Sequence, residues 1–410
     1  MSRLIIYQAL ARLWKEGRFS SWDDASFEYL VSLGVDCLWL TGVPRHASGK
    51  DFVKGDPGSP YAISDWYDIN PYLSDKEEER FDEFKQLISR AHSHGIKILT
   101  DFIPNHVARD YEGDLPVLPY CDYDWTDTLK VDYGHPATFG VMTEIVKFWA
   151  SLGVDGVRCD MVELVPLDFF RALVPAMRAS HPDFLFIGEV YDRNNYSPFL
   201  DAGFDLLYDK SGLYDILVAI RQGGGTARAV TWNWQYLGGM QGRMLNFLEN
   251  HDEKRAAAPD SASLAVSALF NGASFMFYFG QEYGECAPEA SDARTSIFNW
   301  VRKLDPVAQS GSAHTARFRE ILSLASSEPF RSGGNWDLCY AQTDPAFNPD
   351  RHFAFLRFDG SRCFLVLCNF SDEDVSLDIR IPEEAPAISA PGRTIKAGAA
   401  ARDCTVISIR

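Results

Sequence analysis

Ionisable residues stand at the ends of four apolar runs along the chain. The runs are DFIPNH, GVRCD, FLFIGE and FLENHD, and the residues are His106, Arg158, Asp160, Glu189, His251 and Asp252. Paired carboxylates in a neutral pocket can carry out glycoside chemistry. One attacks the anomeric carbon, while a second, whose pKa is raised, protonates the leaving oxygen. This chemistry requires a fold that brings the four run ends together.

Arg158 and Asp160 are separated by one residue in an otherwise apolar run. On a strand, residues two apart point to the same face, so we expect the two side chains to meet. Buried charges without partners are costly, and Arg158 would hold Asp160 ionised as a nucleophile. Taken singly, an aspartate here is also typical of a helix cap, and a histidine of a hydrogen-bonded core position. The coincidence at four run ends favours one shared site.

Eight β-rich apolar runs alternate with helical segments over most of the chain. The runs span residues 4–10, 36–42, 97–103, 156–160, 184–190, 204–209, 244–250 and 275–282. Between them, apolar residues recur three or four apart, as from Phe81 to Ala91. This order predicts an α/β fold, a (β/α)8 TIM barrel whose strand ends meet at one mouth. A doubly wound sheet is the structural alternative, but no glycine-rich phosphate fingerprint follows the first strand.

Two connections are longer than turns, and the last part of the chain changes character. Residues 43–79 follow the second strand, and residues 104–136, rich in Asp, Tyr and Pro, predict a short insertion after strand 3. From about Gly333, the runs FAFLRF, CFLVLCNF and VSLDIRI are separated by turn residues, which predicts antiparallel strands. We therefore expect a catalytic barrel over 1–332 and a C-terminal antiparallel β-domain, a β-sandwich, over 333–410.

The composition narrows the class of partner and the compartment. A net charge of −18 without a basic run argues against nucleic acid, because phosphate binding needs clustered Lys and Arg. No apolar run approaches the ~20 residues of a membrane span, so no membrane partner is expected. The eight cysteines lack metal-binding spacing, and the first residues read as a strand rather than a signal peptide. These features favour a cytoplasmic protein with a neutral substrate.

The strand-end motifs resemble those of the α-amylase family, glycoside hydrolase family 13, in that family's order. The motifs are PYAISDWYDIN (60–70), DFIPNH (101–106), GVRCD (156–160), IGEV (187–190), FLENHD (247–252) and FGQE (279–282). Any one of these motifs is weak evidence for the family, whereas six of them in the family's order are specific for it. The resemblance covers the whole barrel and implies a retaining enzyme, with the two reacting carboxyls about 5–5.5 Å apart.

The resemblance implies catalytic roles for the matched carboxylates. Asp160 would be the nucleophile that forms a covalent glycosyl-enzyme, and Glu189 the general acid and then the base. Asp252 would bind sugar hydroxyls and favour the distorted transition state. Arg158 would belong to the substrate-binding residues of the reacting subsite, where it would position Asp160.

The resemblance also implies residues that bind the sugar in the reacting subsite. Tyr61 would stack against the ring, and His106 and His251 would hydrogen-bond its hydroxyls. Asp101 matches a position that is usually structural and is therefore not expected to be catalytic.

The chain departs from the family pattern after the nucleophile. Many members carry Lys-His where this chain has Glu163 and Leu164, so a different acceptor region is expected. Asn105 matches a calcium ligand of many members. Acidic residues of the insertion either supply further oxygen ligands or form a solvated loop, namely Asp110, Glu112, Asp114, Asp122 and Asp124. No cofactor is expected for the chemistry, and a structural calcium ion stays unassigned.

The sequence thus predicts a retaining hydrolase of α-1,4 bonds in maltooligosaccharides or related α-glucans. The first alternative is an α-glucan transglycosylase of the same family, in which a sugar hydroxyl replaces water. A second alternative is a non-catalytic barrel protein, which the presence of all three carboxylates disfavours. An enzyme that uses phosphate is a further alternative, although no phosphate-binding cluster of residues can be recognised in the sequence.

Overall fold

Eight parallel strands close into a barrel within the described part of the chain. The computed structural model describes residues 3–256 and 260–409. The strands are β1 (Ile5–Leu10), β2 (Cys37–Thr41), β5 (Lys97–Phe102), β8 (Gly156–Cys159), β9 (Leu185–Gly188), β10 (Leu206–Tyr208), β11 (Met244–Phe247) and β12 (Ser274–Tyr278). Each barrel strand pairs with the barrel strands that come before and after it in the sequence. The barrel closes where the last strand, β12, pairs with the first, β1. The predicted (β/α)8 barrel is confirmed.

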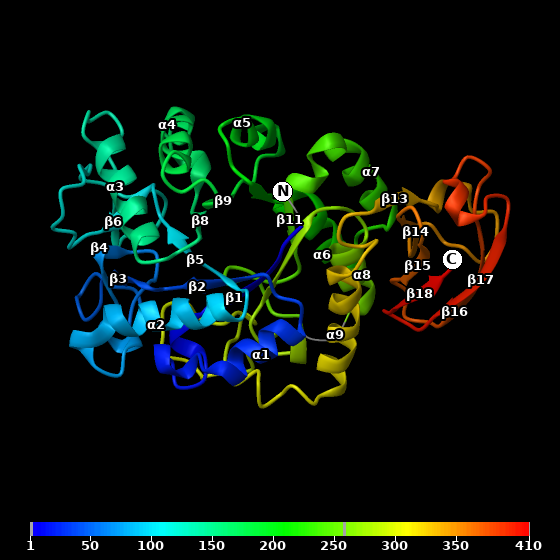
Figure 1. The fold of residues 1–410 in the computed structure, drawn as a ribbon, viewed down its shortest axis with the longest axis horizontal. Helices are drawn as coiled ribbons and strands as arrows, with labels where there is room; N and C mark the ends of the chain where they lie inside the picture. Colours follow the sequence, from blue (N-terminus) through cyan, green and yellow to red (C-terminus); the bar gives the residue numbers. More distant parts are fainter. Residues whose placement is uncertain (1–2, 257–259, 410) are drawn as a thin grey trace.

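Helices follow the barrel strands and cover the outside of the barrel (Figure 1). They are α1 (Asp24–Ser32), α2 (Arg80–Ser93), α3 (Thr138–Ser151), α4 (Leu167–Arg178), α5 (Tyr196–Asp201), α6 (Asp215–Arg221), α7 (Arg228–Leu237), α8 (Ser261–Leu269) and α9 (Ala313–Ser326). The apolar stripe of α2 is buried at Phe84, Leu87, Ile88 and Ala91, as its period predicts. Within the described residues, no helix is long and apolar enough to cross a membrane.

Short antiparallel ribbons occupy the two long connections. β3 (Pro44–His46) pairs with β4 (Ile63–Ile69), and β6 (His106–Ala108) pairs with β7 (Thr128–Lys130).

Two of the predicted apolar runs, 244–250 and 275–282, are longer than the strands observed there, which end at Phe247 and Tyr278. Residues 248–250 and 279–282 lie beyond the ends of these strands.

The end of the chain forms two antiparallel sheets, at the right of Figure 1. One contains β13 (Gly334–Asp337), β14 (His352–Phe358), β15 (Cys363–Asn369) and β18 (Cys404–Ser408), and the other β16 (Val375–Arg380) and β17 (Thr394–Ala399). Leu356 and Leu365 of the first sheet share a buried cluster with Leu377 and Ile379 of the second. These additional sheets confirm the predicted fold class, while the domain boundary at 332/333 stays a prediction.

Candidate active site

A cavity of about 560 Å³ lies at the C-terminal ends of the barrel strands. Six of the seven predicted site residues line it, namely Tyr61, His106, Asp160, Glu189, His251 and Asp252. The seventh, Arg158, is fully buried, with 0% of its side chain exposed. The structure therefore brings all of the predicted residues together, as a TIM barrel does with residues from the ends of different strands.

Strand register sets Asp160 and Glu189 at the same level. Cys159 of β8 is paired with Gly188 of β9, so the next residue on each strand emerges at the rim beside the other. Arg158 contacts both carboxylates, with Nη1 2.6 Å from Oδ1 of Asp160 and Nη2 2.7 Å from Oε1 of Glu189. Its Nη1 is also 3.5 Å from Oδ1 of Asp101. One guanidinium thus offsets the charge of three buried carboxylates, which would be costly without it.

The environment of Glu189 favours a protonated carboxyl. Burial raises the pKa of Glu189 to about 7, and the charges of Asp160 and Asp252 act in the same direction against Arg158. Burial also raises the pKa of Asp160, although Arg158 opposes the shift. A carboxyl that titrates near neutral pH beside a second carboxylate is the arrangement that general acid catalysis requires.

Asp252 and His251 are in contact at the cavity wall. Oδ2 of Asp252 lies 3.0 Å from Nε2 of His251. Burial acts to raise the pKa of Asp252, but the His251 ring outweighs it, so the net pKa of Asp252 is lowered. The pKa of His251 is raised in turn, because the attraction of Asp252 outweighs its burial. The two carboxyls are therefore shifted in opposite directions, with the ionised form favoured at Asp252 and the protonated form at Glu189.

Tyr61 packs against the same histidine. Its hydroxyl is 2.6 Å from Nε2 of His251, and the two rings stack with centroids 5.0 Å apart. On the other side of the imidazole, Nδ1 lies 2.7 Å from Nε2 of Gln8 on β1. Sequence reasoning missed Gln8, because a single glutamine inside an apolar strand carries no motif.

His106 also lines the cavity, at the start of β6. Burial lowers the pKa of His106 to about 4, so the ring is neutral near pH 7. Its ring lies 5.1 Å from that of Trp125, which lines the cavity together with Tyr123 and Phe298. A neutral imidazole among aromatic rings suits hydrogen bonding and stacking with an uncharged ligand.

The position that resembles a calcium ligand contacts a lysine instead. Nζ of Lys130 is 2.6 Å from Oδ2 of Asp122 and 3.1 Å from Oδ1 of Asn105. The ammonium thus occupies the space between the two oxygens that would face a cation. Among the described residues, no group of three or more acidic, histidine or cysteine side chains could hold a metal ion. The residues present do not fit a calcium ion at Asn105.

Two further residues complete the environment of Glu189, and neither was predicted as a site residue. The hydroxyl of Tyr191 donates to Oε1 of Glu189 at 2.7 Å. Glu163, noted only as a departure from the family pattern, accepts the backbone N–H of Tyr191 at 2.7 Å. An aromatic residue two positions after an acidic one was the only available signal for Tyr191.

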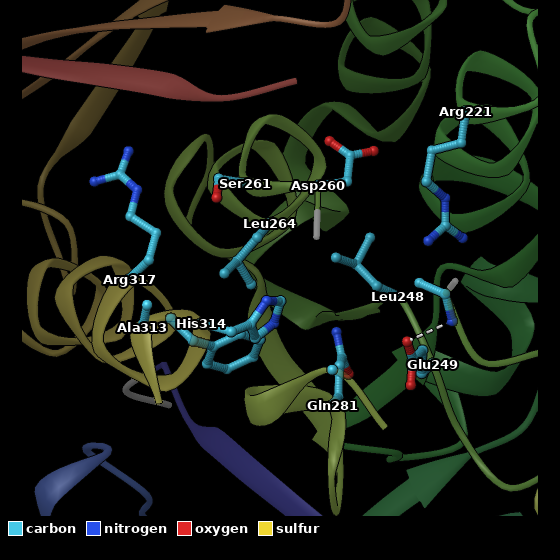
Figure 2. Close-up of a pocket in the computed structure, with 13 residues that line it drawn as sticks. Arg221, Leu248, Glu249, Asp260, Ser261, Leu264, Gln281, Ala313, His314 and Arg317 are labelled. Atoms are coloured by element: carbon cyan, nitrogen blue, oxygen red, sulfur yellow. Dashed lines mark hydrogen bonds between the residues drawn. The ribbon is translucent and has the colours of Figure 1, made fainter. Parts of the chain in front are cut away.

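Figure 2 shows a second cavity, of about 300 Å³, near the ends of β11 and β12 and the N-terminal turns of α8 and α9. Its walls include Glu249, Gln281, His314 and Arg317. Among the described residues, the two cavities share no lining side chain. None of the predicted site residues lies in this second cavity, so the candidate chemistry belongs to the first.

Comparisons with known proteins find similarity to α-amylases and to an α-glucan transferase. The family model "Alpha amylase, catalytic domain" matches residues 25–114. The α-amylase MalA of Haloarcula japonica is 29% identical over 415 residues, which cover 92% of this chain and 56% of that protein. An α-1,4-glucan:maltose-1-phosphate maltosyltransferase of Cereibacter sphaeroides is 28% identical over 208 residues, which cover 43% of this chain and 30% of that enzyme.

A solved structure shows the same fold over nearly the whole chain. It is a noncanonic maltogenic α-amylase, AmyB, of Thermotoga neapolitana, with a TM-score of 0.75 and 24% identity. The match covers 99% of this chain and 96% of that one. By contrast, this chain spans 56% of the length of the Haloarcula protein.

Proposed function

We propose that this chain, which is similar to α-amylases, is a retaining α-glycosidase acting on maltooligosaccharides or related α-glucans. It hydrolyses α-1,4-glucosidic bonds through a covalent glycosyl-enzyme. The observation that carries this proposal is the contact of one guanidinium, that of Arg158, with both Asp160 and Glu189. The pKa of Glu189, raised to about 7, supports the division of roles between the two carboxyls.

In the first step, a carboxylate oxygen of Asp160 attacks the anomeric carbon. The glycosidic bond breaks as Glu189 gives its proton to the leaving oxygen, and a glycosyl ester forms on Asp160. In the second step, Glu189, now a carboxylate, takes a proton from water, whose oxygen displaces Asp160. Two displacements at one carbon restore the original α configuration.

The other residues of the cavity bind and orient the sugar. Asp252, held ionised by His251, accepts hydrogen bonds from sugar hydroxyls and stabilises positive charge at the anomeric centre. Tyr61 stacks on the sugar, and its place against His251 fixes the plane of the ring. His106 binds a hydroxyl as a neutral imidazole.

No cofactor takes part in this mechanism, because side chains supply the nucleophile and every proton transfer. Lys130 fills the place that a calcium ion would take beside Asn105. We place the protein in the cytoplasm, in keeping with its eight free cysteines. Its partner is then the α-glucan itself, without nucleic acid or membrane.

A product-size experiment tests the proposal. The protein is incubated with maltoheptaose in buffer without phosphate, and product sizes are followed by chromatography, with Asp160→Asn as the control. Shorter sugars that form with the native protein and not with the variant are the expected result. No reaction with the native protein, with calcium or phosphate added in turn, would overturn it.

The second candidate is an α-glucan transglycosylase. Glu163 favours this candidate, because it stands where many members of the resembling family carry a lysine that contacts the acceptor sugar. Its carboxylate instead binds the loop after β9, so the acceptor region differs. The similar maltosyltransferase points in the same direction. Products longer than maltoheptaose would support this candidate over hydrolysis.

A further inference from the structure

The oxygens of Glu189 differ in the partners that they meet. Oε1 accepts the hydroxyl hydrogen of Tyr191 at 2.7 Å and lies 2.7 Å from Nη2 of Arg158. Oε2 accepts the backbone N–H of Met161 at 2.8 Å. Burial raises the pKa of the Tyr191 phenol, so that phenol keeps its proton and acts as a donor. Two positively polarised groups thus face Oε1, whereas a single amide faces Oε2.

Glu163 holds Tyr191 in this position from a neighbouring loop. One oxygen of Glu163 accepts the N–H of Tyr191 at 2.7 Å, and the other accepts the N–H of Asp192 at 3.1 Å. The side chain of Asn195 donates to Glu163 as well, at 2.7 Å. The carboxylate therefore joins the loop after β8 to the loop after β9, on which Tyr191 lies.

We propose that Tyr191 is a positioning residue for Glu189, which it orients so that the catalytic proton resides on Oε2, and that Glu163 fixes Tyr191 for this task. The inference rests on the proposed function, because it assigns the proton that cleaves the glycosidic bond. Hydrogen bonds to the ionised form disfavour protonation at the oxygen that accepts them. With Oε1 engaged by Tyr191 and Arg158, the proton goes to Oε2.

Tyr191 is a neutral side chain in contact with Glu189, so it can be replaced without changing the charge of the site. The charged groups that face the carboxyl are Arg158, Asp160 and Asp252, and burial, with a contribution from the charge of Glu189, raises the pKa of the nearby Tyr208 phenol on β10. Replacing any of the charged residues changes the charge of the site. Replacing Tyr191 by phenylalanine removes one hydrogen bond and leaves every charge in place.

The pH dependence of kcat/KM tests the orientation. In Tyr191→Phe the carboxylate loses a donor, so the pKa of Glu189 rises and the high-pH limb moves upward by about one pH unit. The maximum of kcat/KM on maltoheptaose falls about tenfold or more, because the carboxyl is less well oriented.

Tyr236→Phe is the matched control. The Tyr236 hydroxyl donates to the backbone oxygen of Arg193 in the same loop, at 3.1 Å, and lies outside the cavity. We expect this control variant to keep the high-pH limb of kcat/KM at the same pH as in the native protein.

The leaving group gives a second readout. Fluoride departs with little help from an acid, so α-maltosyl fluoride tests the nucleophile without the proton of Glu189. We expect Tyr191→Phe to lose several times less activity on the fluoride than on maltoheptaose. A general distortion of the site would reduce both to the same extent.

A double-mutant cycle tests the part assigned to Glu163. Glu163→Gln keeps one acceptor oxygen and brings an amide group against the backbone donors, so it loosens Tyr191. It shifts the high-pH limb in the same direction as Tyr191→Phe, and by less. In the Tyr191→Phe background it adds no further shift, because residues that act through one another are not additive.

The outcomes separate this inference from the proposed function. If the native protein cleaves maltoheptaose but Tyr191→Phe keeps the native limb, as Tyr236→Phe does, the inference fails and the proposed function stands. Equal losses on maltoheptaose and the fluoride also overturn the inference. If the native protein cleaves no α-glucan, the proposed function fails and the inference falls with it.

Discussion

The guanidinium of Arg158 lies 2.6 Å from the carboxylate of Asp160, which follows directly after the end of β8. The pair accounts for the two charges in an otherwise apolar run. Arg158 is fully buried, and its second nitrogen contacts Glu189. A single cation therefore links the two carboxyls to which we assign the chemistry.

Replacement of Arg158 should affect stability and activity differently according to the substitute. Arg158→Met leaves three carboxylates without their cation, and we expect about 3–5 kcal/mol of destabilisation by thermal or urea unfolding. Arg158→Lys keeps the charge, but one ammonium cannot contact both carboxyls as the fork does. We expect its fold to survive while kcat falls about 100-fold. Arg171→Lys, on the surface of α4, serves as the control and should match the native protein.

The activity should fall on the alkaline side near pH 7. Glu189 must be protonated for the first step, and its pKa is raised to about 7 by burial. As pH rises through that value, the acid is lost and kcat/KM declines. On the acid side, Asp160 must be ionised, and its pKa is also raised, so activity falls at a pH above the usual aspartate range. A rate profile that stays flat to about pH 9 would contradict this assignment.

Lys130 should replace a structural calcium ion in stabilising the insertion. Its ammonium joins Asp122 to Asn105, so a chelator should leave the melting temperature of the native protein unchanged. Lys130→Met should destabilise the protein by about 1–2 kcal/mol, because Asp122 loses its ion pair and Asn105 loses a donor. A drop in melting temperature when the native protein is treated with chelator would show that calcium is bound after all.

Glu282 should make the fold less stable as pH rises. This carboxyl is fully buried, it accepts hydrogen bonds from Tyr7 and Tyr29, and burial raises its pKa to about 7. The folded state holds the proton more tightly than the unfolded chain does. The resulting stabilisation is complete below about pH 4.5 and is lost as pH rises to about 7, a change of about 3 kcal/mol.

The variant Glu282→Gln isolates this contribution. Unfolding free energies of the native protein and the variant are compared at about pH 5 and about pH 8 by urea titration. The native protein should lose up to about 3 kcal/mol more than the variant between the two values. Parallel pH dependence of the two proteins would mean that Glu282 does not titrate in this range.

The barrel and the acid groups at its rim were predictable because both leave a local signal. The eight strands are largely apolar runs, Asp160 and Glu189 each follow one of them directly, and Asp252 lies shortly after the end of β11 at Phe247. Closure of the barrel then brings the strand ends together whatever the connections do. The strands β3, β6 and β7 carry no comparable pattern, since three-residue strands show no alternation.

The contacts among loops could not be predicted from the sequence. The departure at Glu163 was visible, but its partners Tyr191 and Asn195 lie on another loop and are set by the packing of β8 against β9. Lys130 is distant from Asn105 in sequence, and only the pairing of β6 with β7 brings the two together. Such contacts depend on the fold rather than on any local run of residues.

The most direct test of the account is to find the glycosyl group on Asp160. In Glu189→Gln, α-maltosyl fluoride can still form the glycosyl ester, because fluoride needs little protonation, whereas water is no longer activated to remove it. Peptide mass spectrometry of the treated variant should show one maltosyl group on the peptide that contains Asp160. An adduct on another residue, or none at all while the native protein consumes the fluoride, would contradict the assignment of Asp160 as the nucleophile.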